Sequence, residues 1–262
     1  MPARPDYFRF LHALKKDVST SFGDIGVVAL EYCESHQSLE PTAPQFFMKT
    51  PLLALAPDCP LPTQLKQANS ALSHLLNKGI SPGNIVIGGD SVGGNLVLQL
   101  ASHFLHPLPS IPPPPTLSQP LAGAMFISPW CAYDQNRPSY VRNGEKDVIP
   151  AVTYAQFSQF LVAELTSELE PYCHPFVAPA SWWKGLDGVF ARALITAGEN
   201  EGPLDHIIEI GTTISQNVKD TVTMVETGAV HEEMIFRFAT GKDGVGKVYE
   251  DMVVFLSRSF ES

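Results

Sequence analysis

Positive charge is scarce in this sequence. Its 262 residues include 17 Lys and Arg against 27 Asp and Glu, which leaves a formal net charge of −10 at pH 7. Nucleic acids and anionic lipid surfaces attract basic proteins, so a chain this acidic lacks the electrostatic footprint for either. We therefore expect neither nucleic acid nor a membrane surface as its partner.

Long apolar runs and paired cysteines are also missing. No stretch reaches 18 consecutive apolar residues, so we expect no membrane span. The cysteines are widely spaced, without a C-x-x-C pair, and predict reduced, mostly buried thiols; they are Cys33, Cys59, Cys131 and Cys173. The N-terminus lacks the apolar core of a secretory signal. These observations predict a cytoplasmic protein without a metal, and nothing in the sequence calls for a cofactor.

Apolar residues, in contrast, are plentiful. Hydrophobic residues make up 44% of the chain and charged residues 17%. Disordered proteins combine low hydrophobicity with high net charge, so this composition excludes global disorder. The length fits a single large α/β domain with a real core.

The apolar pattern alternates between short strand-like runs and helical periods. Strands are predicted over 25–32, 84–88, 122–128, 192–197 and 221–226, and helices over 5–18, 63–78, 92–105, 151–164, 205–217 and 245–258. This alternation predicts an α/β fold in which helices cover both faces of a mostly parallel sheet.

Two segments break the alternation. Residues 107–120 hold a proline cluster that fits neither a helix nor a central strand, which predicts an exposed loop with extended character. Residues 33–53 follow a predicted strand but show no clean period. A loop of that length is unusual inside a compact domain, so we interpret it as an insertion.

The strongest local motif lies between a predicted strand and a predicted helix. It reads G-x-S-x-G and consists of Gly89, Asp90, Ser91, Val92, Gly93 and Gly94. A nucleophile elbow requires this strand–turn–helix setting, with Ser91 in a strained turn and glycines where Cβ atoms would clash. The amide of Val92, at the helix N-terminus, would then donate to an oxyanion. The alternative is a plain glycine-rich turn.

Two later loops supply an acid and a histidine. Glu201 and Asp205 follow the strand predicted over 192–197, and His231 follows the one over 221–226. The order Ser, acid, His is that of an α/β-hydrolase triad, in which the histidine takes the serine proton and the acid fixes its tautomer. Most single histidines are structural, but of the eight here only His231 lies in a loop after a strand at the right place in the order.

The stretch over 63–131 resembles the hormone-sensitive-lipase branch of the α/β-hydrolases, and within it fungal esterase-like members. The resemblance rests on the G-D-S-x-G-G elbow, Leu55-Ala56-Pro57, Ile127-Ser128-Pro129-Trp130 and the acid loop. It implies Ser91 as nucleophile and His231 as base. The family's acid loop reads D-P-L-x-D, which favours Glu201 as the acid and keeps Asp205 as the alternative. Residues 136–185 would be the cap and substrate-pocket segment.

The sequence departs from that family in one respect. Members carry an H-G-G-G loop whose amides supply most of the oxyanion hole, and these 262 residues contain no such motif. We therefore expect residues 1–262 to form a single, N-terminally incomplete α/β-hydrolase domain, in which only the Val92 amide is left to stabilise the oxyanion. Weak activity and exposed sheet edges that favour association are expected consequences.

Two functions remain open. The first is a carboxylic-ester hydrolase, esterase- or lipase-like or a deacetylase, that acts on a small-molecule ester through an acyl-enzyme. The second is a catalytically impaired relative that serves as a ligand-binding or interaction module, as a plant hormone receptor of the same family does. The oligomeric state is not predicted.

Overall fold

The computed structural model describes residues 5–22, 25–28, 61–163, 165–241 and 246–261. Within these ranges the strands are β1 (Val86–Asp90), β2 (Gly123–Ile127), β3 (Arg192–Gly198) and β4 (Asp220–Glu226). The α-helices are α1 (Pro5–Phe22), α2 (Thr63–Asn77), α3 (Val92–Leu105), α4 (Pro138–Arg142), α5 (Ala151–Val162), α6 (Glu170–Cys173), α7 (Leu204–Ser215), α8 (Glu233–Ala239) and α9 (Lys247–Ser259). The predicted α/β fold is confirmed.

The four strands form one parallel sheet in the order β1-β2-β3-β4. The last residues of neighbouring strands lie side by side: Asp90 is paired with Ile127, and Gly198 with Glu226. Because carboxyl ends of parallel strands meet at one edge of a sheet, the loops after β1, β3 and β4 emerge together. Those are the loops that hold the candidate serine, acid and histidine.

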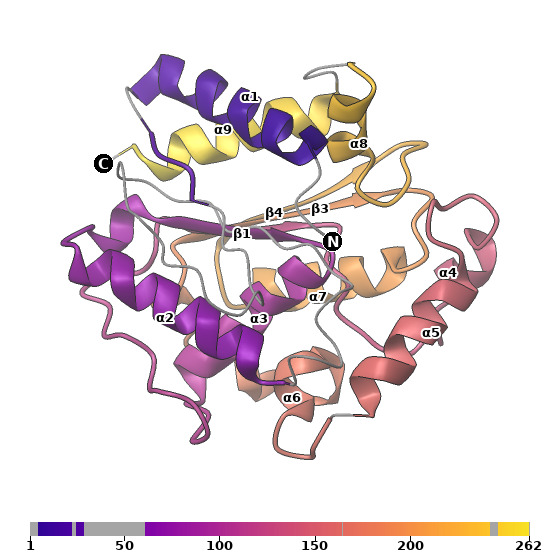
Figure 1. The fold of residues 1–262 in the computed structure, drawn as a ribbon, viewed down its shortest axis with the longest axis horizontal. Coiled ribbons are helices and arrows are strands. Elements are labelled where there is room, and N and C mark those ends of the chain that lie inside the picture. The colour runs from indigo at the N-terminus through magenta and orange to yellow at the C-terminus, as the bar shows by residue number, and fades with distance from the viewer. Residues whose placement is uncertain (1–4, 23–24, 29–60, 164, 242–245, 262) are drawn as a thin grey trace.

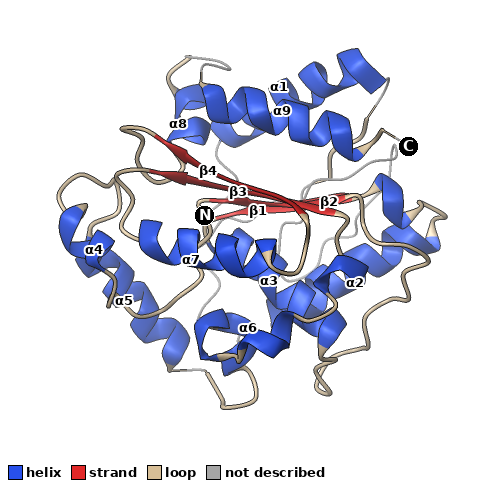
Figure 2. Ribbon diagram, turned by 180° about the vertical axis from the view of Figure 1, so that it is seen from behind, coloured by secondary structure: helices blue, strands red, loops and turns tan. Residues whose placement is uncertain are grey.

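Helices cover both faces of the sheet. Helices α1, α8 and α9 lie on one face, and α2, α3 and α7 on the other, while α4, α5 and α6 pack beyond the second layer (Figures 1 and 2). Strands β1 and β2 are buried on both faces, and so is β3 apart from its first residue, whereas β4 at the edge of the sheet is partly exposed. Met125 and Ile127 of β2 join the core under α1, α8 and α9, whereas Ala124 and Phe126 join the core against α2, α3 and α7.

The strand predicted over 25–32 is not found in its described part. Residues 25–28 belong to no strand. Among the strands that the structure describes, β1 therefore lies at an edge of the sheet. The amide of Ile25 lies 3.4 Å from Ser19 Oγ of α1, and the Ile25 side chain is buried in the core beside that helix. Ile25 is thus buried by packing beside α1 instead of by strand pairing. Residues 29–32 and the insertion predicted over 33–53 lie outside the described residues.

The proline-rich segment is a mostly exposed loop, as predicted. Residues 107–120 contain neither helix nor strand. The loop is held to the body of the molecule through the carbonyl of Pro112, which accepts a hydrogen bond from Asn69 Nδ2 of α2 (2.9 Å) and lies 3.0 Å from His103 Nε2 of α3. Leu108 and Ile111 are buried and anchor its first half.

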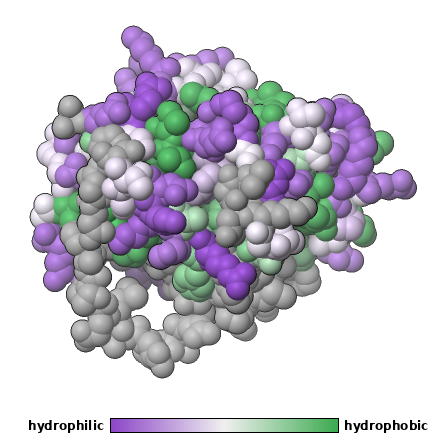
Figure 3. Space-filling view, turned by 90° about the horizontal axis from the view of Figure 1, so that it is seen from above, coloured by the Kyte–Doolittle hydropathy of each residue, from purple (hydrophilic) through white to green (hydrophobic). Residues whose placement is uncertain are grey.

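The cysteines in the described residues are free thiols, and the surface mixes hydrophobic with hydrophilic residues. Cys131 and Cys173 are free and buried, while Cys33 and Cys59 lie outside the described residues. On the face seen in Figure 3, hydrophobic residues form small groups among hydrophilic ones. Among the helices described, none is long and apolar enough to cross a membrane.

Candidate active site

Ser91 occupies a sharp turn between β1 and α3. Its backbone adopts φ 50° and ψ −116°, a conformation that L-residues rarely take. Three backbone hydrogen bonds hold it there. The Ser91 amide donates to the carbonyl of Ile127 (2.9 Å), and the Ser91 carbonyl accepts from the amides of Asn95 (3.2 Å) and Trp130 (2.9 Å). This is the strained strand-to-helix turn that the G-x-S-x-G motif predicts.

Two glycines of the motif are required by close backbone approach. A Cβ atom on Gly89 would lie 2.2 Å from the carbonyl oxygen of Gly93. A Cβ atom on Gly94 would lie 2.6 Å from the Cβ of Pro129, in the segment after β2. The turn can therefore close only without side chains at these two positions.

His231 lies between β4 and α8, and its ring reaches Ser91. Its Nε2 atom is 3.0 Å from Ser91 Oγ. The ring of Tyr154, from α5, packs edge-on against the imidazole, with the ring centroids 6.0 Å apart. His231 is 1% exposed, so its geometry is set by protein groups and not by bulk water.

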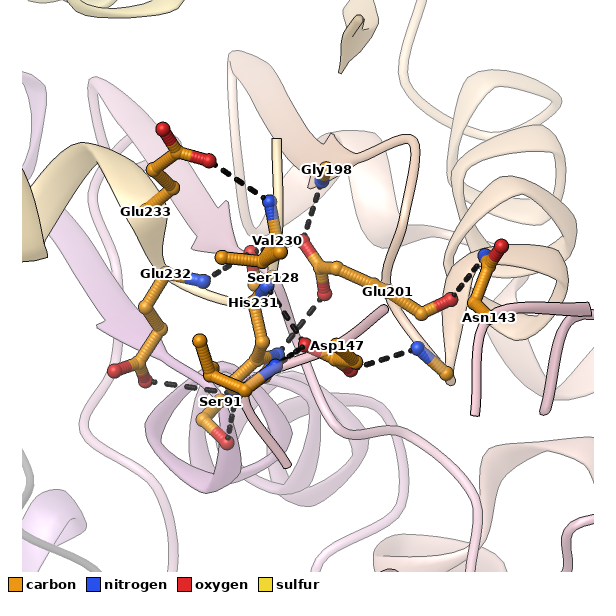
Figure 4. A network of polar contacts seen from close by, with 12 residues as sticks. Ser91, Ser128, Asn143, Asp147, Gly198, Glu201, Val230, His231, Glu232 and Glu233 are labelled. Carbon is orange, nitrogen blue, oxygen red and sulfur yellow. Dashed lines mark hydrogen bonds and ion pairs between the residues drawn. The ribbon is translucent and has the colours of Figure 1, made fainter. Parts of the chain in front are cut away.

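Glu201 supports the opposite side of the imidazole. Its Oε2 atom is 3.0 Å from His231 Nδ1, and its Oε1 atom accepts hydrogen bonds from the hydroxyl of Ser128 (2.6 Å) and the amide of Gly198. Glu201 has no exposed surface, and these three partners compensate the burial of its charge. Figure 4 shows the three side chains in line, from Glu201 through His231 to Ser91.

This arrangement fixes the roles of the ring nitrogens in neutral His231. A carboxylate only accepts hydrogen bonds, so the contact with Glu201 keeps the proton on Nδ1. Nε2 is then free to accept the proton of the Ser91 hydroxyl. The site has the geometry needed to activate an alcohol as a nucleophile.

Nearby carboxylates control the protonation of His231. Burial alone would lower the pKa of its imidazole, but the hydrogen bond and charge of Glu201, together with the charges of Glu232 and Asp147, raise it to about 9. The protonated ring is therefore strongly stabilised in the absence of substrate.

The two acids considered from the sequence lie in different places. Asp205 does not contact His231: its carboxylate accepts a hydrogen bond from the amide of Ser139 (2.9 Å) and forms an ion pair with Arg142 (3.1 Å). It joins the start of α7 to α4. The structure thus brings Ser91, His231 and Glu201 together and leaves Asp205 outside.

The remaining elbow residues have distinct surroundings. Val92 is the first residue of α3, so its amide is one of the four at the helix start that have no partner within the helix. The carboxyl of Asp90 is buried and accepts a hydrogen bond from the hydroxyl of Tyr7 in α1. The sequence motif contains Asp90 but gave no sign of this contact with α1.

The segment over 136–185 contributes residues that sequence reasoning missed. Asp147 accepts hydrogen bonds from the amides of His231 (3.0 Å) and Gly202 (2.8 Å), and Asn143 Nδ2 donates to the carbonyl of Glu201 (2.7 Å). These contacts tie the segment to both loops of the site. Their only sequence signal was the place of the segment between the elbow and the acid loop.

The aromatic residues of this region pack into the core. Trp130 is 1% exposed, and its ring lies 5.6 Å from that of Tyr133 and 5.7 Å from that of Tyr154. Trp183 is equally buried, which leaves neither tryptophan available for stacking on a base. In the part of the chain that the structure describes, no group of three or more His, Cys, Asp and Glu side chains is arranged to hold a metal ion.

Comparison with known families agrees with the fold and the elbow. The sequence profile of a family described as having the alpha/beta hydrolase fold matches residues 51–235, which is most of the chain. The protein therefore belongs to this α/β-hydrolase family. No curated protein is a significant match.

Solved structures of esterases share the fold. They include a mutant of the esterase E40 (23% identity, TM-score 0.62), an esterase from the bacterial hormone-sensitive lipase family (22%, 0.62) and an esterase/lipase from an uncultured bacterium (23%, 0.61). Each similarity covers 79% of this chain and 63–64% of the other protein. The chain thus spans a little under two thirds of the length of these relatives, and at such identities the likeness shows the fold.

Proposed function

We propose that the protein is a carboxylic-ester hydrolase of the hormone-sensitive-lipase type, with Ser91 as nucleophile, His231 as general base and Glu201 as the supporting acid. The observation that carries this proposal is the continuous contact from Glu201 through His231 to Ser91, with both distances at 3.0 Å and Ser91 in the strained turn. Family membership and the esterases among the similar structures support it.

Acylation is the first half of the reaction. Ser91 Oγ attacks the carbonyl carbon of the ester while its proton moves to His231 Nε2, and the carbonyl oxygen becomes an oxyanion. The imidazolium then gives that proton to the departing alcohol as the C–O bond breaks. The products are an ester of Ser91 and the free alcohol.

Deacylation repeats these steps with water. Neutral His231 removes a proton from water as the oxygen attacks the acyl carbon, and it returns the proton to Ser91 Oγ when the acid leaves. Glu201 holds the ring in the productive tautomer in both halves and stabilises its charged form.

The amide of Val92 would stabilise the oxyanion. It follows the nucleophile directly and lies at the N-terminus of α3, where partial positive charge favours an anion. The loss of one oxyanion donor costs a factor of about 10²–10³ in rate, so a site that relies on Val92 alone would be slow. The substrate is a small-molecule ester, and residues 136–185 shape the pocket for it.

Turnover of a short-chain p-nitrophenyl ester tests the proposal. We expect the purified chain to hydrolyse p-nitrophenyl acetate, Ser91→Ala to lose that activity, and Ser110→Ala, in the exposed proline-rich loop, to keep it. A folded protein without turnover that binds an ester analogue, and does so equally after Ser91→Ala, would instead be a ligand-binding module.

A further inference from the structure

A second carboxylate faces the reactive nitrogen of His231. Glu232 Oε1 lies 3.7 Å from His231 Nε2, the atom that also lies 3.0 Å from Ser91 Oγ (Figure 4). The Glu232 side chain is 13% exposed, so water screens its charge only weakly. The imidazole therefore has one carboxylate at each ring nitrogen, Glu201 at Nδ1 and Glu232 at Nε2.

The backbone holds Glu232 in this place. Glu232 adopts φ 54° and ψ 22°, in the left-handed region that non-glycine residues seldom occupy. Its amide lies 3.4 Å from Ser128 Oγ, and the Ser128 hydroxyl in turn donates to Glu201 Oε1. Ser128 thus joins the segment that carries Glu232 to the carboxylate on the other side of the ring.

Asp90 is a partner of the Glu232 carboxylate. It is 5% exposed, its carboxyl hydrogen-bonds with Glu232, and the hydroxyl of Tyr7 donates to it. Two carboxyl groups in hydrogen-bond contact share a proton, because both cannot be charged at such short range. Burial first, and then the charge of Glu232, raise the pKa of Asp90 well above its usual range, against the lowering effect of Tyr7. The proton therefore belongs to Asp90, and the charge of Glu232 is among the causes that raise the pKa of His231.

We propose that Glu232 is a positioning residue that stabilises the protonated form of His231 from the Nε2 side. The inference rests on the proposed function, in which His231 takes the proton of Ser91. Glu232 favours the imidazolium once it has formed, but it also makes the neutral ring scarcer before substrate binds. Glu232 therefore lowers activity at neutral pH and raises the reaction rate at alkaline pH.

The other groups around His231 act elsewhere on the residue. Glu201 contacts Nδ1, Asp147 contacts the main-chain amide, and the ring of Tyr154 packs against the imidazole from α5. Tyr7, from α1, faces Asp90. Of the carboxylates around His231 in the described structure, Glu232 is the one with a contact to Nε2.

Titration of the His231 ring by NMR, without substrate, tests the inference independently of catalysis. The imidazole signal is assigned by its loss in His231→Gln. We expect Glu232→Gln to lower the pKa of His231 by about one unit, which is a tenfold change in the proton equilibrium. Glu250→Gln removes the same charge from an exposed position on α9 and should leave the titration unchanged.

The pH profile of kcat/KM supplies the second readout. In Glu232→Gln the apparent pKa of the acidic limb should fall by the same one unit. The plateau of kcat/KM at alkaline pH should fall about threefold, because a weaker base transfers protons less effectively. The two profiles should cross, with the variant about threefold faster at pH 7. A purely structural role would lower kcat/KM at every pH without moving the limb.

Asp90→Asn distinguishes the effect of Asp90 on the pKa of His231 from that of Glu232. It also provides a test if Glu232→Gln does not fold. Asparagine resembles the protonated aspartic acid, so the pKa of His231 should stay within about half a unit of the parent value. A fall of a full unit would mean that Asp90 carries the charge, and an unchanged titration in Glu232→Gln would mean that Glu232 does not act on the ring. Either result overturns the inference. A shifted titration in a protein that hydrolyses no ester would instead uphold the effect of Glu232 on the His231 ring and refute the proposed function.

Discussion

The main-chain amide of His231 donates a 3.0 Å hydrogen bond to Asp147, across 84 positions of sequence. The second oxygen of the same carboxylate accepts a 2.8 Å hydrogen bond from the amide of Gly202, the residue after Glu201. One side chain from the segment between α4 and α5 therefore holds the histidine loop and the acid loop in a fixed relation.

Asp147→Asn should lower both activity and stability. The carboxamide offers one acceptor oxygen where two were used, so one of the two amides loses its partner at a cost of about 1–3 kcal/mol. We expect a lower thermal midpoint and a roughly tenfold fall in kcat/KM. Asp187→Asn, at an exposed position, is the matched control for thermal unfolding and ester kinetics. Equal behaviour of the two variants would show that Asp147 does not position the loops.

Glu201→Gln and Asp205→Asn should have unequal effects on rate. The first replaces the carboxylate that fixes the His231 tautomer, and we expect kcat to fall by about 10³–10⁴. The second weakens a partly exposed ion pair with Arg142, worth at most about 1 kcal/mol, and should leave kcat within about threefold. Steady-state kinetics of both variants decide the matter, and a larger loss in Asp205→Asn would assign the acid to Asp205.

Stability should fall as pH rises above neutrality. The pKa of His231 is raised to about 9 in the folded protein, against about 6.5 when unfolded, so the folded state binds more protons between these values. The stabilisation, roughly 3 kcal/mol, is fully present below pH 6.5 and lost by pH 9. The raised pKa of Asp90 acts in the same direction. Thermal midpoints measured from pH 6 to 9.5 should fall more steeply for the parent than for His231→Gln, and parallel curves would contradict the assignment.

Gly89→Ala should disrupt the elbow. Its Cβ atom would meet the Gly93 carbonyl at 2.2 Å, and neither backbone segment can move without breaking the turn. We expect destabilisation of about 3 kcal/mol or more, or no soluble protein. Gly188→Ala is the control, because no atom lies within 4 Å of its added Cβ. Urea unfolding of the two variants makes the comparison, and a Gly89→Ala protein as stable as the parent would exclude the close contact.

Much of the fold could be predicted because the spacing of apolar residues distinguishes strands from helices wherever the sheet is covered by helices on both faces. The helix predicted over 92–105 begins and ends as α3 does, since the glycine-rich turn marks its start. The strand predicted over 25–32 was wrong in its described part, because apolar content alone does not distinguish a paired strand from a segment packed on a helix end.

The site could be predicted only as far as short motifs reach. The elbow around Ser91 and the loop position of His231 follow from local sequence. Spacing could not separate Glu201 from Asp205, which are four positions apart, whereas the structure places Glu201 and not Asp205 beside the ring of His231. Asp147 and Glu232 are placed beside His231 by a long-range hydrogen bond and a left-handed backbone, and neither feature leaves a signal in one sequence.

The most direct test of the central claim is the site of covalent labelling by a fluorophosphonate. Such a reagent reacts with a serine hydroxyl that a neighbouring histidine activates. Peptide mass mapping should find one phosphonyl group per chain on the peptide that contains Ser91, strongly reduced labelling in His231→Gln, and none in Ser91→Ala. A folded protein that is not labelled, or that is labelled equally after Ser91→Ala, would contradict the assignment of Ser91 as the nucleophile.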